Sequence, residues 1–105
     1  MRYYVGANGK SPFADWLWSL PDRNAVARAQ IRLERLRLGN FGDVRSLGMG
    51  LSEVRSDSGP GYRVYLMLEG KSMAVLLCGG DKATQKKDIR RAREYAIDYR
   101  RRTDA

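Results

Sequence analysis

Apolar residues near the N-terminus recur at helical spacing. Ser11 followed by Pro12 is typical of a helix that begins with an N-cap and a proline in its first turn. Phe13, Leu17 and Leu20 then recur every three or four residues, so we expect a short helix from about Pro12 to Leu20. A short helix with one apolar stripe needs another surface to cover that stripe.

A second amphipathic helix follows a break at Pro21 and Asp22, and we expect it to run from Arg23 to Leu38. Its apolar stripe consists of Val26, Ala29, Leu33 and Leu36. The arginines that lie largely off this stripe are Arg28, Arg32 and Arg35. Gly39 and Asn40 end the helix. Two consecutive helices with a tight joint predict a helical hairpin.

After Gly39 the pattern changes from helical spacing to alternation and to aromatic and β-branched runs. The expected strands are Tyr3–Val5 near the N-terminus, then Leu51–Ser56, Tyr62–Leu68 and Met73–Cys78. Turn residues separate the last three strands at positions 59–61 and 69–71. Because consecutive strands joined by short turns pair antiparallel, we expect a mostly antiparallel sheet.

The last element is a helix after Gly79 and Gly80, with Thr84 as its expected cap and an end near Arg102. Its apolar stripe consists of Ile89, Ala92 and Ala96. The predicted order is β-α-α-β-β-β-α in a single domain that covers residues 1–105. We therefore predict an α+β fold in which the helical hairpin and the C-terminal helix pack on a small sheet.

Charge and composition narrow the classes of protein. The 105 residues, 43% of them apolar, suit one domain with a modest core. There are 20 Lys and Arg against 12 Asp and Glu, and the formal charge of +8 favours a polyanionic partner such as nucleic acid, an acidic protein or a membrane surface. No signal peptide and no bilayer-spanning apolar run is visible, so we expect a cytoplasmic protein without membrane contact.

The sequence holds no histidine and a single cysteine, Cys78. We therefore expect no metal site and no cofactor, and any catalysis has to use Lys, Arg, Tyr and carboxylate side chains. Cys78 has no partner for an internal disulfide, and the apolar residues before it predict a core position in a reducing compartment.

Alternation along the first hairpin strand predicts that Val54 faces the core and that Glu53, Arg55 and Asp57 face the other way. On the next strand Arg63 shares that second face, so Arg55 and Arg63 are expected to be cross-strand neighbours. Two like charges at that distance are unfavourable unless an anion lies between them. The segment 79–82 then brings Lys82 next to a glycine-rich helix start, where free N–H groups bind anions.

A second interpretation stays open for each of these groups. Arg55 forms a salt bridge with Glu53 or Asp57 in that case, and Arg63 and Lys82 only solvate the surface. The last helix carries a basic run that is either a nucleic-acid footprint or a solvated face: Lys86, Lys87, Arg90, Arg91, Arg93, Arg100, Arg101 and Arg102. Tyr95 and Tyr99, one turn apart, either stack on bases or pack in the core.

An ordered set of motifs is spread over most of the chain. Its parts are Gly39-Asn40-Phe41-Gly42-Asp43, Leu47-Gly48, Gly50-Leu51-Ser52-Glu53-Val54-Arg55, Gly59-Pro60-Gly61-Tyr62-Arg63-Val64-Tyr65, Gly79-Gly80-Asp81-Lys82, Thr84-Gln85 and Asp88-Ile89. The set resembles the phage-derived killer-protein branch of the RelE/ParE toxins, often described as HigB-like. The resemblance extends from Phe13 and Trp16 to Ala92.

The resemblance implies the toxin of a type II toxin–antitoxin pair, with a microbial-RNase-like α+β fold. Such toxins of the RelE and HigB branches enter the ribosome and cut mRNA without a metal, whereas the ParE branch poisons DNA gyrase. Implied partners are a cognate antitoxin of the helix-turn-helix type, the ribosome with its mRNA, and operator DNA bound jointly with the antitoxin. A non-enzymatic basic subunit that binds antitoxin and operator DNA is a third alternative.

By position, the resemblance assigns Arg55, Arg63 and Lys82 to the scissile phosphate. Arginines suit the extra negative charge that develops when the RNA 2′-OH attacks phosphorus, and Lys82 is either the base or the acid. Further RNA contacts are expected from Tyr62, Lys86, Lys87, Arg90 and Arg91. The chain departs from many RelE-like enzymes because it has no histidine and no tyrosine at an obvious catalytic position near its C-terminus.

Overall fold

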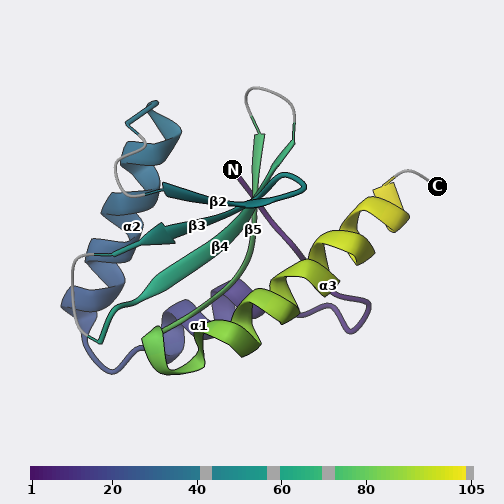
Figure 1. Cartoon of the computed structure of the whole chain (residues 1–105). Helices are drawn as coiled ribbons and strands as arrows, with labels where there is room; N and C mark the ends of the chain where they lie inside the picture. The colour runs from purple at the N-terminus through teal and green to yellow at the C-terminus, as the bar shows by residue number, and fades with distance from the viewer. Residues whose placement is uncertain (41–43, 57–59, 70–72, 104–105) are drawn as a thin grey trace.

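The computed structural model describes residues 1–40, 44–56, 60–69 and 73–103. Its elements (Figure 1) are β1 (Arg2–Tyr3), α1 (Pro12–Ser19), α2 (Arg23–Arg37), β2 (Val44–Gly48), β3 (Leu51–Arg55), β4 (Arg63–Glu69), β5 (Met73–Gly80), a 3-10 turn (Lys82–Thr84) and α3 (Gln85–Thr103). The α+β class and the order of the predicted elements are confirmed, and the structure adds one strand, β2, between α2 and β3.

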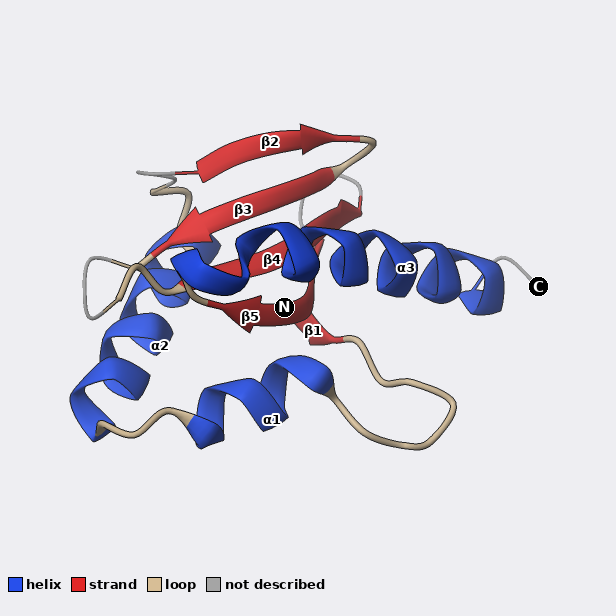
Figure 2. Ribbon diagram, turned by 60° about the horizontal axis from the view of Figure 1, so that its bottom comes forward, coloured by secondary structure: helices blue, strands red, loops and turns tan. Residues whose placement is uncertain are grey.

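The five strands form one sheet in the order β1-β5-β4-β3-β2 (Figure 2). The pairs β2/β3, β3/β4 and β4/β5 are antiparallel, and only the short β1 pairs with β5 in parallel. The prediction of a mostly antiparallel sheet is therefore confirmed. The expected turn at 69–71 lies only partly within the described residues, which end at Glu69 on that side.

Helices cover both faces of the sheet. The helical hairpin of α1 and α2 packs on one face, and α3 packs on the other (Figure 2). The buried residues of the first layer include Phe13, Leu17, Val26, Ala29, Leu33, Leu36, Val54, Val64 and Leu66. Those of the second layer include Tyr4, Leu51, Tyr65, Met67, Val75, Leu77, Ala92, Ala96 and Tyr99. The predicted stripes of α2 and α3 thus face the sheet as expected.

The helix starts follow the predicted capping chemistry in two of three cases. Ser11 accepts a hydrogen bond from the Ala14 N–H at 3.2 Å, and Asp22 accepts one from the Asn24 N–H at 2.8 Å. The helix α3 begins at Gln85, directly after the predicted cap, Thr84, and Asp81 caps the 3-10 turn that leads into it. The helical segment therefore begins at Lys82, earlier than expected.

The edge strand β2 was not predicted because its sequence shows no alternation. Most of its residues are exposed, and its pairing with β3 shifts register between Ser46 and Gly48. An edge strand that is exposed and bulged has no period-2 apolar pattern, so its sequence resembles a loop.

Gly79 and Gly80 are needed because one helix from each layer approaches the end of β5. A methyl group on Gly79 would lie 2.3 Å from the Trp16 ring of α1, and one on Gly80 would lie 1.8 Å from the Asp88 carboxylate of α3. Both contacts are much closer than van der Waals distance. The two glycines therefore allow α1 and α3 to close on opposite faces of the same strand end.

Gly79→Ala is expected to lower the free energy of unfolding by about 1–3 kcal/mol, because the new methyl group overpacks the contact with Trp16. In a Trp16→Leu background the same change is expected to lower it by less, since the indole ring is gone. Urea unfolding followed by circular dichroism measures both values. An equal loss in both backgrounds would show that Trp16 is not the cause.

Candidate functional site

A pair of arginines lies at one end of the central hairpin. Arg55, the last residue of β3, is the direct register partner of Arg63, the first residue of β4. This confirms the predicted cross-strand pairing. Tyr65, two residues after Arg63, packs in the layer under α3, so the pair lies on the α3 face of the sheet.

The carboxylate of Glu53 offsets the charge of Arg63. Both residues are buried, at 4% and 3% exposure, and Glu53 Oε1 lies 3.5 Å from Arg63 Nε. The same carboxylate lies 3.6 Å from Arg45 Nη2 and accepts a hydrogen bond from Gln85 Nε2 at 2.9 Å. Glu53 therefore joins β2, β4 and α3 through its two oxygens.

The structure gives Arg55 and Arg63 different environments. Arg63 pairs with Glu53 and also donates to the Gly61 carbonyl oxygen at 2.6 Å, so it is neither solvated nor without a counter-charge. Arg55 is exposed, and among the described residues it has no ion pair. Asp57, its other expected partner, lies outside the described residues.

These side chains line a pocket of about 400 Å³ formed by Val44, Arg45, Glu53, Arg55, Arg63 and Gln85. Three arginines and one glutamate give its lining a formal charge of +2. Two buried polar atoms at this place have no hydrogen-bond partner in the described part of the chain, Arg63 Nε and the Tyr65 hydroxyl. Burial, together with the carboxylates of Glu53 and Asp88, raises the pKa of Tyr65, so its hydroxyl keeps its proton. The arrangement is suited to an anion.

Lys82 lies beside this pocket on the 3-10 turn and is exposed. Its N–H donates to the Pro60 carbonyl oxygen at 3.4 Å. A methyl group on Gly61 would lie 3.0 Å from Arg63 Nη1 and 3.5 Å from Lys82 Cβ, so Arg63 and Lys82 both flank Gly61. The three residues predicted to surround a phosphate, Arg55, Arg63 and Lys82, are therefore brought to one end of the sheet.

The expected anion site on the backbone at this helix start is not supported. Asp81 Oδ1 accepts the Thr84 N–H at 3.1 Å, and the Asp81 N–H donates to the Thr84 hydroxyl at 3.4 Å. A carboxylate of the protein itself therefore occupies the place where an external anion would bind. Recognition of an anion in this region has to rely on side chains.

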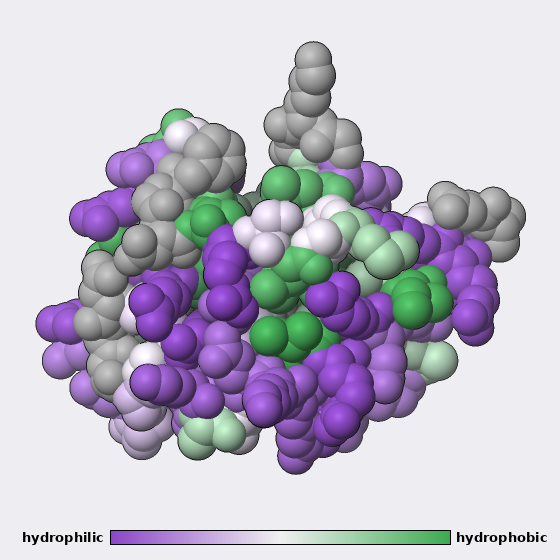
Figure 3. Space-filling view, viewed as in Figure 1, coloured by the Kyte–Doolittle hydropathy of each residue, from purple (hydrophilic) through white to green (hydrophobic). Residues whose placement is uncertain are grey.

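The other predicted RNA contacts are distributed unevenly. Tyr62 is 8% exposed and packs edge-on against Trp16 on the face opposite to Arg63, so it does not lie in the pocket. The basic residues expected to contact RNA from α3 are all exposed, namely Lys86, Lys87, Arg90 and Arg91. Hydrophilic side chains cover most of α3 in Figure 3.

Tyr95 and Tyr99 confirm the packing interpretation. The Tyr95 ring stacks on Tyr4 with centroids 5.0 Å apart. The Tyr99 hydroxyl donates to Glu69 at 2.9 Å and accepts from Arg2 at 2.8 Å. Both tyrosines therefore hold the C-terminal half of α3 against the sheet and the N-terminal strand.

Cys78 is buried as predicted. Its thiol donates to the Asp88 carbonyl oxygen at 3.7 Å, and burial with the nearby Asp88 raises its pKa to about 12. A thiol that stays protonated is a poor nucleophile. Cys78 is therefore a core residue.

Sequence reasoning missed the roles of Arg45, Glu53 and Gln85 in the pocket. Arg45 was missed because β2 itself was not predicted. Glu53 was placed on the correct face, and its position two residues before Arg55 is the signal that a carboxylate accompanies the arginines. Gln85 carried no signal beyond its place at the start of the last helix.

No group of three or more metal-ligating His, Cys, Asp or Glu side chains is found in the described parts of the chain. Within the same residues, no helix is both long and apolar enough to span a membrane.

The fold and the pocket define a small basic α+β protein with an arginine-lined pocket at the end of its sheet. The chain is 48% identical over 84 residues to an uncharacterized protein of Haemophilus influenzae, an alignment that covers 80% of this chain and 85% of that protein. The chain belongs to the same family as that protein. No protein-family model matches the chain. No solved structure matches it either.

Glu53→Leu is expected to lower the free energy of unfolding by about 3–5 kcal/mol, because it leaves Arg63 buried without a counter-charge. In the double variant Glu53→Leu/Arg63→Met most of this loss is expected to be recovered, since no buried charge remains. Urea unfolding of the four proteins in the cycle measures the coupling.

The matched control is Arg55→Ala, which removes an exposed arginine with no ion pair among the described residues. Its free energy of unfolding is expected to change by less than about 0.5 kcal/mol. A double variant as unstable as Glu53→Leu alone would contradict the assignment of Glu53 as the counter-charge of Arg63.

Proposed function

We propose that the chain is the toxin of a type II toxin–antitoxin pair of the RelE/ParE class and acts as a ribosome-dependent, metal-independent mRNA endonuclease. The observation that carries the proposal is the cross-strand pair of Arg55 and Arg63 in a pocket that holds three arginines and one carboxylate. Guanidinium groups bind phosphate oxygens through paired N–H donors, so this pocket suits the backbone of RNA.

The residues in and beside the pocket supply the parts of an RNA cleavage reaction. The RNA 2′-OH loses its proton to a base, its oxygen forms a bond to phosphorus, and the bond to the 5′ oxygen breaks as that oxygen takes a proton. Arg55 and Arg63 stabilise the negative charge that develops on the non-bridging phosphoryl oxygens. Lys82 beside the pocket either takes the proton of the 2′-OH or donates one to the leaving oxygen, while Glu53 stays ionised as the counter-charge of Arg63.

The proposal includes partners and a compartment. The ribosome presents mRNA to the arginine pocket, and the exposed basic residues of α3 contact ribosomal or messenger RNA phosphates. A cognate helix-turn-helix antitoxin silences the toxin, and the two bind operator DNA together. This activity takes place in the cytoplasm, where the mRNA is translated.

Induction of the chain without its antitoxin is expected to arrest growth and to produce mRNA cuts in phase with codons. Arg55→Ala and Lys82→Ala are expected to lower the cleavage rate on the order of a hundredfold each, because each removes a charge from the scissile phosphate. Mapping mRNA 5′ ends after induction measures both effects. Both residues are exposed, so both variants keep the fold.

The matched control is Arg35→Ala, which removes an exposed arginine from α2, the helix that packs on the face of the sheet opposite to α3 and to the arginine pair. It is expected to cut mRNA like the wild type. Arrest without cuts, together with cleaved or relaxed plasmid in a gyrase assay, would replace the proposal with a gyrase poison of the ParE kind. Normal growth after induction would favour the third alternative, a non-enzymatic subunit that binds antitoxin and operator DNA.

RNA binding is expected to depend on salt. Contacts to about four phosphates give a slope near −3 for the logarithm of the binding constant against the logarithm of salt concentration. Arg55→Ala is expected to reduce the size of this slope by about 0.7, since it removes one contact. Fluorescence anisotropy with a labelled single-stranded RNA measures both slopes, and a flat dependence would contradict binding through phosphates.

A further inference from the structure

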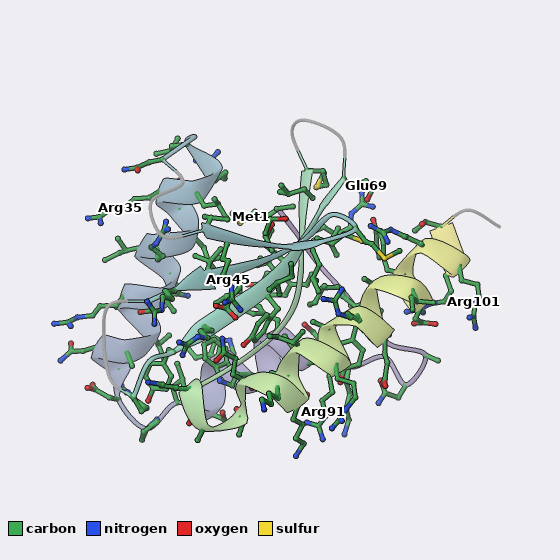
Figure 4. The ribbon with its side chains drawn as sticks, in the orientation of Figure 1. Met1, Arg35, Arg45, Glu69, Arg91 and Arg101 are labelled. Atoms are coloured by element: carbon green, nitrogen blue, oxygen red, sulfur yellow. The ribbon has the colours of Figure 1, made fainter. Side chains whose placement is uncertain are left out.

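A second pocket lies near the start of α3, on the side of the helix away from the arginine pocket. It has a volume of about 340 Å³, and its lining includes Trp16, the end of β5 from Cys78 to Gly80, Asp88, Arg91 and Tyr95. Figure 4 shows Arg91 on the side of α3 opposite to Arg45, which lines the arginine pocket. The two pockets adjoin, because Gly80 of the second is the register partner of Arg63 in the first.

The end of β5, which lines this second pocket, has one open edge. The strand β1 pairs with β5 only at Val75 and Leu76, and in the described residues no strand pairs with the same edge from Leu77 to Gly80. Gly79 and Gly80 have no side chains to cover that edge. An unpaired edge presents N–H and C=O groups that hydrogen-bond to a ligand.

Asp88 places a carboxylate at this pocket, and few hydrogen-bond donors of the protein contact that carboxylate. It is 7% exposed, and one of its oxygens accepts a hydrogen bond from the Thr84 hydroxyl. No ion pair of Asp88 is found among the described residues. Burial raises the pKa of Asp88, whereas the Thr84 hydroxyl, its hydrogen-bond donor among the described residues, and the charge of Arg91 lower it. Further donors would stabilise the carboxylate. A ligand with adjacent N–H groups would supply them.

The walls of the pocket are planar groups. Trp16 contributes an aromatic ring and Arg91 a guanidinium plane, whereas the Tyr95 ring is already stacked on Tyr4. Such groups stack on nucleobases, which also hydrogen-bond to backbone groups and carboxylates through their edges. A peptide strand would use the same open edge, but the buried carboxylate and the planar walls favour a flat ligand that donates N–H groups.

We propose that this second pocket binds a guanine base of single-stranded RNA, whose N1–H and N2–H groups donate to Asp88. The identity of the ligand as RNA rests on the proposed function. Lys82 follows Asp81 of the second pocket and flanks Gly61 together with Arg63 of the first. A guanosine held by Asp88 would therefore place the neighbouring phosphate toward Arg55 and Arg63. The pocket thereby selects the nucleotide next to the bond that is cut.

The test is a titration of the ¹⁵N-labelled protein with the 3′-monophosphates of guanosine, adenosine, cytidine and uridine, followed by NMR. Guanosine monophosphate is expected to bind at least about tenfold more tightly than the other three, because hydrogen bonds to a buried carboxylate are strong. The shifts are expected at the Trp16 indole N–H and at the amides of Gly79 and Gly80.

Asp88→Asn is expected to abolish the preference for guanosine, and Arg91→Ala, an exposed position that leaves the fold intact, to weaken guanosine binding severalfold. Glu94→Gln is the matched control, since it removes an exposed carboxylate from the same helix without touching the pocket. The wild-type titration tests the proposal even where Asp88→Asn fails to fold.

Equal affinity for the four nucleotides, with shifts only around Arg55 and Arg63, would overturn the guanine pocket. Nucleotide binding that causes no shifts at Trp16, Gly79 and Gly80 would also overturn the guanine pocket. The open edge of β5 would then be available for pairing with a strand of a partner protein. A guanosine preference in a protein that cuts no mRNA would support the pocket and reject the nuclease. Cuts without guanosine beside them would support the nuclease and reject the pocket.

Discussion

The buried ion pair between Glu53 and Arg63 is the constraint on which the functional end of the molecule depends. Transfer of either charge from water into the interior alone would cost several kcal/mol, so each residue is tolerated there only because of the other. The pair forms in the strand register that places Glu53 of β3 opposite Tyr65 of β4. A slip of one residue would turn these side chains to the other face of the sheet.

The same pair attaches the surrounding elements to the site. Gln85 at the start of α3 donates to Glu53, and Arg45 from the edge strand β2 lies close to its second oxygen. The position of the last helix over the sheet is therefore coupled to the position of the Arg63 guanidinium. Rigid support of this kind holds a charged group in one place without help from a ligand.

The start of α3 explains why the site relies on side chains. Gly79, Gly80 and a following helix suggest a backbone anion site from the sequence, but the carboxylate of Asp81 caps this start and accepts the Thr84 N–H. The glycines serve close packing by Trp16 and Asp88 instead. The charged donors that the pocket offers to an anion are then those of the arginines, whose planar N–H groups match the geometry of a phosphate.

The sequence was sufficient for the features that periodicity and alternation encode. The two amphipathic helices of the hairpin, the last helix, three of the strands and the pairing of Arg55 with Arg63 follow from patterns that burial imposes on the chain. The strand β2 did not follow, because it is exposed and bulged and buries too little to leave a pattern. The counter-charge from Glu53 and the contact of Gln85 depend on distances between separate elements, which no local pattern contains.

The lack of histidine shapes what this pocket does with an anion. A histidine site changes its charge within the physiological pH range, whereas arginine guanidinium groups remain charged throughout it. The charge of the pocket therefore comes from three arginines that hold a constant charge and from one carboxylate that is itself held by two of them. Binding of an anion at such a site responds to salt, which screens these charges, more strongly than to pH. The arginine charges that this pocket presents to an anion are therefore constant across the physiological pH range.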